Sequence, residues 1–168
     1  MPEWIKRIAV VKVIVLTTIG VVFVVGMRRK SPPVQRAVRS LNRAVFNPMQ
    51  MGSAGSPGAY ASLVHHVGRT SGTDYTTPIG ALPAEDGFVI ALPYGTTADW
   101  LQNVLAAGTA TIVHDGETFS VDRPTVVPMA DVAESFSESD QRIHRMFAID
   151  QAMRVRHAAA VSADPSTM

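Results

Sequence analysis

The sequence predicts an α+β protein: a small antiparallel β-barrel, closed or nearly closed, with flanking helices and an apolar helix ahead of it. Several short β-patterned segments follow one another between residues 59 and 128, separated by turn residues. One helical pattern is inserted among them, and a long apolar stretch lies near the N-terminus. This order is typical of a barrel with helices at its margins.

The composition limits the classes of protein to which the chain can belong. Its 168 residues, 46% of them hydrophobic, suffice for one domain with a core. The chain has no cysteine, which excludes disulfides, thiolate catalysis and Cys-ligated metal centres. The formal net charge of +1 gives no reason to expect nucleic acid. Positive charges concentrate before residue 45, which favours a membrane surface as partner.

Residues 1–30 are expected to form an N-terminal membrane anchor. Residues 8–26 are apolar except for Lys12, Thr17 and Thr18, and a helix needs about 20 such residues to cross a bilayer. A cleaved signal peptide is the alternative, but no small-residue cleavage site precedes the basic residues that follow the span. More Lys and Arg follow the span than precede it, so the positive-inside bias predicts a single-pass protein of the cell membrane with its folded domain in the cytoplasm.

Residues 31–58 are expected to form an amphipathic helix followed by a flexible linker. Ser31 is placed to act as N-cap, with prolines in the first turn. The apolar stripe of this helix consists of Val34, Ala37, Val38, Leu41 and Val45. The opposite face carries Arg36, Arg39 and Arg43. Two placements remain open, on anionic headgroups or with the apolar stripe against the barrel. Residues 47–58 are rich in Gly, Pro and Ser, which is typical of a linker.

Residues 59–161 are expected to form the barrel domain. The predicted strands span residues 59–67, 75–82, 88–92, 110–114 and 117–122, with a last one at 123–128. Pro78 favours an edge position for the second strand, and Asp115-Gly116 predicts a hairpin turn. A helix is predicted from residue 98 to 107, ending at Gly108. Further helical patterns cover residues 130–137, 141–149 and 151–160, and residues 162–168 are expected to be disordered.

The turn between the first two predicted strands is the strongest candidate for a binding site. Gly68 and Gly72 bound it, and such a turn bends sharply and presents backbone N–H groups on one side. Arg69, Thr70 and Ser71 add charged and neutral donors. This chemistry suits a phosphate group. An ordinary hairpin with a polar tip is the alternative, since turns are commonly made of these residues.

Four segments, taken in order, resemble a known family. They are Gly68-Arg69-Thr70-Ser71-Gly72, Thr76-Thr77-Pro78-Ile79, Ala91-Leu92-Pro93-Tyr94-Gly95 and Asp99-Trp100-Leu101-Gln102-Asn103. Their order and spacing are similar to those of the deazaflavin (coenzyme F420)-dependent nitroreductase and quinone reductase family of split β-barrel proteins. The family's pattern is Gly-Arg-x-Ser-Gly, a strand with Thr-Pro and a hydrophobic residue, a Gly-containing loop and a Trp-x-x-Asn helix. The resemblance covers residues 63–128.

The resemblance implies that the chain binds coenzyme F420, a deazaflavin with a ribityl phosphate and an oligoglutamate tail. The turn at 68–72 would meet the phosphate and the anionic tail, and the loop at 94–97 would close over the ribityl phosphate. Part of the second strand would lie along the ring, while the helix start would face the same site. The residues so implied are Gly68, Arg69, Thr70, Ser71, Gly72, Thr77, Pro78, Ile79, Tyr94, Gly95, Thr96, Thr97, Trp100 and Asn103. Strand geometry adds His66, because one of the two adjacent strand histidines is expected to face the cofactor edge.

Two positions depart from the family's pattern. Members often carry a cation where this chain has Thr70, and another near Tyr75. Fewer cations predict a weaker hold on a polyglutamate tail, or a different flavin. FMN therefore remains the alternative cofactor.

Other site classes are disfavoured by residue spacing. His65 and His66 are adjacent on a strand and point to opposite faces, so they cannot ligate one metal together. The remaining histidines are scattered, and no metal site is predicted. Ser71 lacks the G-x-S-x-G frame of a hydrolase nucleophile.

The sequence thus indicates a membrane-anchored oxidoreductase that transfers a hydride from reduced coenzyme F420 to a lipophilic acceptor such as a quinone, with nitro compounds as side substrates. No catalytic side chain is assigned, because the cofactor carries the difficult chemistry. A barrel that binds F420, another flavin or a lipid without turnover is one alternative. An FMN-dependent reductase is the other.

Overall fold

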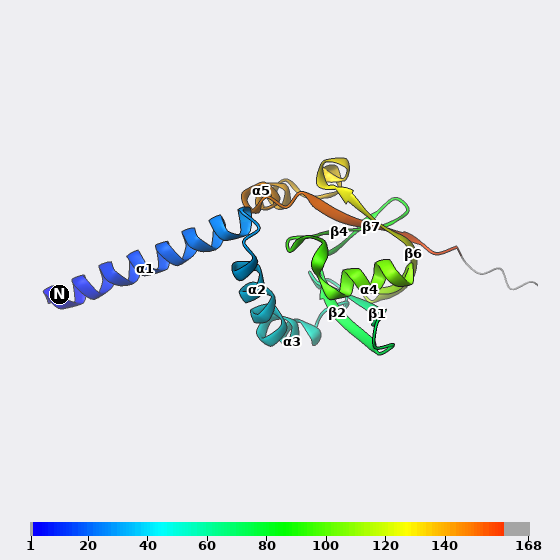
Figure 1. Ribbon diagram of the computed structural model, residues 1–168, viewed down its shortest axis with the longest axis horizontal. Helices are drawn as coiled ribbons and strands as arrows, with labels where there is room; N and C mark the ends of the chain where they lie inside the picture. Colours follow the sequence, from blue (N-terminus) through cyan, green and yellow to red (C-terminus); the bar gives the residue numbers. More distant parts are fainter. Residues whose placement is uncertain (1, 160–168) are drawn as a thin grey trace, which may run out of the picture.

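The computed structural model describes residues 2–159, with one long helix standing clear of a folded domain (Figure 1). Helix α1 (Glu3–Arg28) is long and apolar enough to cross a membrane, as predicted. Apolar side chains are exposed along most of its length. A helix that is apolar all round requires a nonpolar environment, which the folded domain does not supply to this one.

The amphipathic helix is present and longer than expected. Helix α2 (Pro32–Leu41) continues through a π-helical turn, η1 (Asn42–Phe46), into α3 (Asn47–Met51), so the first five residues of the predicted linker are helical. Ser31 holds the N-cap position, but its side chain makes no capping hydrogen bond. None of the ten described residues of α2 is buried. Val34 and Val38 are half-buried against the protein, while Leu41 is 50% exposed.

Seven antiparallel strands form one curled sheet, a half-barrel that confirms the predicted fold class. The strands are β1 (Ser62–Val67), β2 (Asp74–Ile79), β3 (Ala81–Ala84), β4 (Gly87–Ala91), β5 (Thr109–His114), β6 (Glu117–Pro128) and β7 (Gln151–His157). Their spatial order is β2-β1-β5-β6-β7-β4-β3. The edge strands β2 and β3 pair with only one neighbour each among the described residues, so the barrel is open. Pro78 lies in edge strand β2, as predicted.

Three predictions about secondary structure were wrong. The predicted strand at 75–82 is two strands, β2 and β3, separated at Gly80. The predicted helix at 151–160 begins instead with strand β7, which pairs with both β6 and β4. The predicted helix at 130–137 is two short 3₁₀ turns, η3 (Met129–Asp131) and η4 (Ala133–Ser135). The tail at 162–168 lies outside the described residues.

The main core fixes α4 (Asp99–Ala107) against the sheet. Leu101 and Val104 of α4 are completely buried, together with Val64, Ile112 and Met153 from three strands. The helix ends at Gly108 in the left-handed conformation, as predicted. A second cluster, Val89, Met129, Val132, Phe136 and Ala152, lies beneath the 3₁₀ turns and leads to α5 (Glu138–Phe147). Burial of α4 holds the start of that helix in a fixed position.

Gly87 is expected to be irreplaceable, because a Cβ at this position would lie 2.1 Å from the carbonyl oxygen of Val155 in β7. Gly87→Ala is therefore expected to lower the free energy of unfolding by about 1–3 kcal/mol, the usual cost of forced overpacking. Thermal unfolding of the full chain in detergent micelles measures the change. Gly80→Ala is the matched control, since a Cβ there meets nothing within 4 Å. Equal losses in the two variants would contradict the prediction.

Candidate functional site

The turn between β1 and β2 uses most of its own amides. The Gly68 N–H donates to the Thr73 carbonyl at 2.8 Å, and the Gly72 N–H donates to the Gly68 carbonyl at 2.8 Å. Gly72 has φ +64°, a conformation that favours glycine, and a Cβ at Gly68 would require the Ser71 and Tyr75 side chains to move. Within residues 2–159, only the amides of Thr70 and Ser71 in this turn lack a protein acceptor. The turn therefore offers fewer free donors than the sequence predicts.

A buried amide joins the turn to α4. Asn103 is 5% exposed, and its Oδ1 accepts from the backbone N–H of Arg69 at 3.2 Å and from the Arg69 guanidinium at 2.8 Å. Its Nδ2 lies 3.2 Å from Nδ1 of His66. The His66 Nε2 in turn lies 3.1 Å from the Thr77 hydroxyl on β2. Four of the predicted site residues thus form one continuous hydrogen-bonded chain.

This hydrogen-bonded chain determines which ring nitrogen of His66 carries the proton. The Asn103 Nδ2 carries only protons, so it donates to an unprotonated Nδ1, and the proton of His66 resides on Nε2 facing Thr77. Burial, with a smaller contribution from the charge of His65, lowers the pKa of His66 below its ordinary value. His66 is therefore neutral at pH 7. Its ring stacks on that of Tyr75, with centroids 5.8 Å apart, and Tyr75 is 46% exposed.

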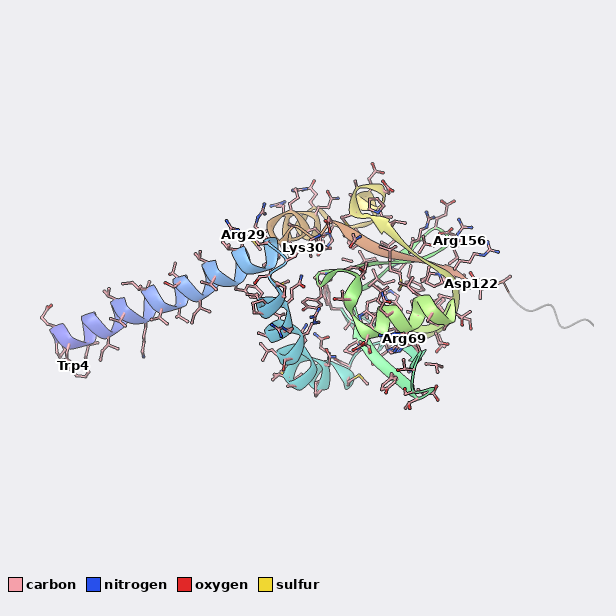
Figure 2. The ribbon with its side chains drawn as sticks, in the orientation of Figure 1. Trp4, Arg29, Lys30, Arg69, Asp122 and Arg156 are labelled. Carbon is pink, nitrogen blue, oxygen red and sulfur yellow. The ribbon has the colours of Figure 1, made fainter. Side chains whose placement is uncertain are left out.

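Arg69 is held across the start of α4. Its Nη2 lies 3.5 Å from a carboxylate oxygen of Asp99 in the first turn of that helix. Both side chains are partly exposed, so the ion pair contributes little stability. Its consequence is positional: Asn103 and Asp99 together direct the guanidinium toward the helix N-terminus, and Figure 2 labels Arg69 beside α4.

Helix α2 and the turn η1 contribute two site residues that sequence reasoning missed. The guanidinium of Arg39 donates to the Thr97 hydroxyl at 3.1 Å. The Asn42 amide donates to the Tyr94 hydroxyl, and burial raises the pKa of that phenol, which therefore stays protonated at neutral pH. Arg39 was predicted to lie opposite the apolar stripe of this helix, and the placement of the two faces was left open. The spacing of Arg39 and Asn42, one helical turn apart on the half-buried side, is the signal that was available.

The predicted residues divide into two groups. The loop at 94–97 is joined to α4, since the Gln102 side chain donates to the Thr96 carbonyl at 2.7 Å. The turn at 68–72, His66, Thr77 and Asn103 therefore lie with this loop around one end of α4. Ile79, in contrast, is 7% exposed in the core, and Trp100 packs partly buried against the same core. These two side chains therefore pack in or against the core.

None of the predicted site residues lines either of two cavities in the structure. One cavity lies beside α5, and the other lies on the outer face of β6 and β7 among Arg123, Arg154 and Arg156. The residues around α4 therefore form a polar surface rather than the lining of either cavity. Within residues 2–159 there is no group of three His, Asp or Glu side chains positioned to hold a metal ion.

Comparison with known proteins gives distant structural similarities. No protein-family model and no curated protein matches the chain. The chain is similar to HutZ, a haem storage protein from Vibrio cholerae, with 12% identity and TM-score 0.44 over 61% of this chain and 84% of that one. A protein of unknown function from Agrobacterium tumefaciens matches with 13% identity and TM-score 0.43 over 70% of this chain and 57% of that one. A domain-swapped dimer matches with 10% identity and TM-score 0.47 over 72% and 98%. Similarities this distant carry no argument about the site.

His66 is expected to titrate below pH 6.5 and to carry its proton on Nε2. Because its native pKa lies below the unfolded value, its neutral form contributes stability above the unfolded pKa, and that stability is lost as the pH falls toward the native pKa. A ¹⁵N NMR titration of the imidazole nitrogens in the full chain measures both quantities. His66→Gln identifies the resonances. A midpoint at or above 6.5 would contradict the prediction.

Proposed function

We propose that the chain is a membrane-anchored oxidoreductase that binds reduced coenzyme F420 and delivers its hydride to a lipophilic acceptor. A membrane quinone is the acceptor class proposed, with nitro compounds as side substrates. The observation that supports this proposal is that two guanidinium groups flank the start of α4. Arg39 donates to Thr97 just before the helix, and Arg69 pairs with Asp99 in its first turn.

The donors around the start of α4 fit a phosphate group. The first N–H groups of a helix lack intrahelical acceptors, and Ala98 at the N-cap provides no side-chain cap. These N–H groups and the helix dipole favour an anion. Guanidinium groups bind phosphate oxygens in pairs, and the Thr96 and Thr97 hydroxyls add neutral donors. Asp99 offsets one of the two cations, which leaves a modest positive charge at this point.

The chain's own residues would bind the cofactor, orient it and exclude water from it. Asn103 positions Arg69, and neutral His66 adds no charge beside it. Thr77 on edge strand β2, with the exposed ring of Tyr75 on the same face, offers a surface for a planar ring, whereas the adjacent Pro78 lies on the other face. The deazaflavin would supply the hydride chemistry when bound. No side chain is assigned as a proton donor to the acceptor.

The anchor is the reason for proposing a lipophilic acceptor. A site tethered at the bilayer meets membrane-dissolved molecules at high effective concentration. The charge distribution around α1, which favours a cytoplasmic domain, supports the proposed topology. Two alternatives follow from Thr70 and Tyr75, which stand where the family often has cations: F420 or lipid binding without turnover, and reduction through FMN.

Arg39→Gln and Arg69→Gln are each expected to weaken F420 binding about tenfold, because a hydrogen bond to a charged group contributes roughly 1.5 kcal/mol. Fluorescence titration of F420 against the full chain in detergent micelles measures the affinity. Arg123→Gln is the control, since this exposed arginine lies on β6 at the opposite end of α4, where its backbone N–H donates to the Gly108 carbonyl. Unchanged affinity in both site variants would remove the proposed site.

A turnover experiment separates the proposed function from its alternatives. Reduced F420 is mixed with the full chain and a soluble quinone, and the cofactor absorbance is followed. Quinone-dependent oxidation supports the proposal, whereas F420 binding without oxidation supports the non-catalytic alternative. FMN binding in clear preference to F420 supports the FMN-dependent reductase.

A further inference from the structure

Helix α5 contacts the C-terminal end of α1, the proposed membrane helix. The guanidinium of Arg28 donates to the carbonyls of Arg145 and Met146 in the last turn of α5, at 2.7 and 2.9 Å. The rings of Phe23 and Phe147 meet edge to face with centroids 5.7 Å apart. A cation at the carbonyl end of a helix also complements its dipole. The position of α5 relative to the membrane is therefore set by α1.

These contacts place α5 at the level of the lipid headgroups. The apolar part of α1 ends where Arg28, Arg29 and Lys30 begin, which marks the boundary with water, and Figure 2 labels the last two of these residues beside α5. Phe23 lies five residues earlier, about 7–8 Å deeper along a helix. Since Phe147 contacts Phe23, the end of α5 reaches this depth. Ile143 and Met146 of α5 are each 45% exposed, as expected at an interface.

A cavity of about 460 Å³ lies at this junction and is rich in positive charge. Arg28, Lys30 and Arg145 line it, with Asp150 as the one carboxylate among its described lining residues. Lys30 pairs with Asp150 at 2.7 Å. The Arg145 guanidinium has no hydrogen-bond or ion-pair partner within residues 2–159. His144 also lines the cavity, is 9% exposed, and has an Nδ1 without a partner among the same residues.

We propose that this cavity binds the phosphate of an anionic phospholipid headgroup. Three cations against one carboxylate favour a phosphate, and the free guanidinium of Arg145 has the donors to hold its oxygens. A lipid is favoured over free phosphate because the cavity adjoins the apolar surface of α1, where acyl chains would lie. The lipid would tie α5 to the headgroup layer and limit rotation of the domain about the anchor. This inference rests on the proposed membrane anchoring and is independent of F420.

The test measures lipid retention by native mass spectrometry of the full chain released from detergent micelles. Micelles contain either dioleoyl phosphatidylglycerol or dioleoyl phosphatidylcholine at equal concentration. The wild type is expected to retain phosphatidylglycerol preferentially. Arg145→Gln should reduce that retention about fivefold, the effect of one cation at a membrane surface. Arg142→Gln is the matched control, because Arg142 lies on the same helix, pairs with Glu138 and does not line the cavity.

Three results would overturn the inference: equal retention of the two lipids, no effect of Arg145→Gln, or complete displacement of phosphatidylglycerol by millimolar inorganic phosphate. The last result would identify a soluble phosphate site. Arg145 is exposed and its side chain bonds to no described residue, so the substitution should leave the thermal unfolding midpoint unchanged. Loss of lipid preference with intact F420 binding would overturn this inference alone, and the converse would overturn only the proposed function.

Discussion

The arrangement of the site depends on the buried side-chain amide of Asn103. Its oxygen accepts two hydrogen bonds from Arg69, and its nitrogen donates to His66. One residue of α4 thus holds that helix to both the turn at 68–72 and the end of β1. A buried amide left without these partners costs about 1–3 kcal/mol, so the turn, the imidazole and the helix keep one relative position. The direction of Arg69 and the location of the His66 proton on Nε2 both follow from this contact. The anion binding proposed for this surface therefore depends on packing as well as on composition.

Helices and strands were predictable where turn residues mark their ends. Gly108 marks the end of α4, and Asp115-Gly116 closes the β5–β6 hairpin, because both positions need a backbone conformation that few residues adopt readily. Strand β7 was missed for the opposite reason. Ala152, Met153 and Arg154 are good helix formers. However, Ala152 and Met153 are buried on opposite faces of a central strand, and this burial outweighs their helical preference. Such burial comes from partners far away in the sequence, which propensity does not register.

The site likewise contains residues that local sequence patterns identify and residues that only long-range contacts place. Arg69 and Asn103 were found because their segments have a recognisable order, and His66 because one of two adjacent strand histidines was expected to face the site; the structure joins all three. Arg39 and Asn42 were missed because their partners lie more than fifty residues away, 58 and 52 positions along the chain. An amphipathic pattern identifies two faces of a helix without identifying what each face meets. Here residues of both faces meet the protein, since Val34, Val38 and Arg39 are all half-buried.

The half-burial of Arg39 connects α1 to the site. Helix α2 follows α1 directly, and its half-buried side places Arg39 and, one turn further on, Asn42 against the loop at 94–97. Its other side leaves Leu41 and Val45 50% and 41% exposed. Because α1 also contacts α5 through Arg28, this apolar helix is connected to the folded domain through both α2 and α5. The orientation of α1 is therefore coupled to the orientation of the polar surface around α4.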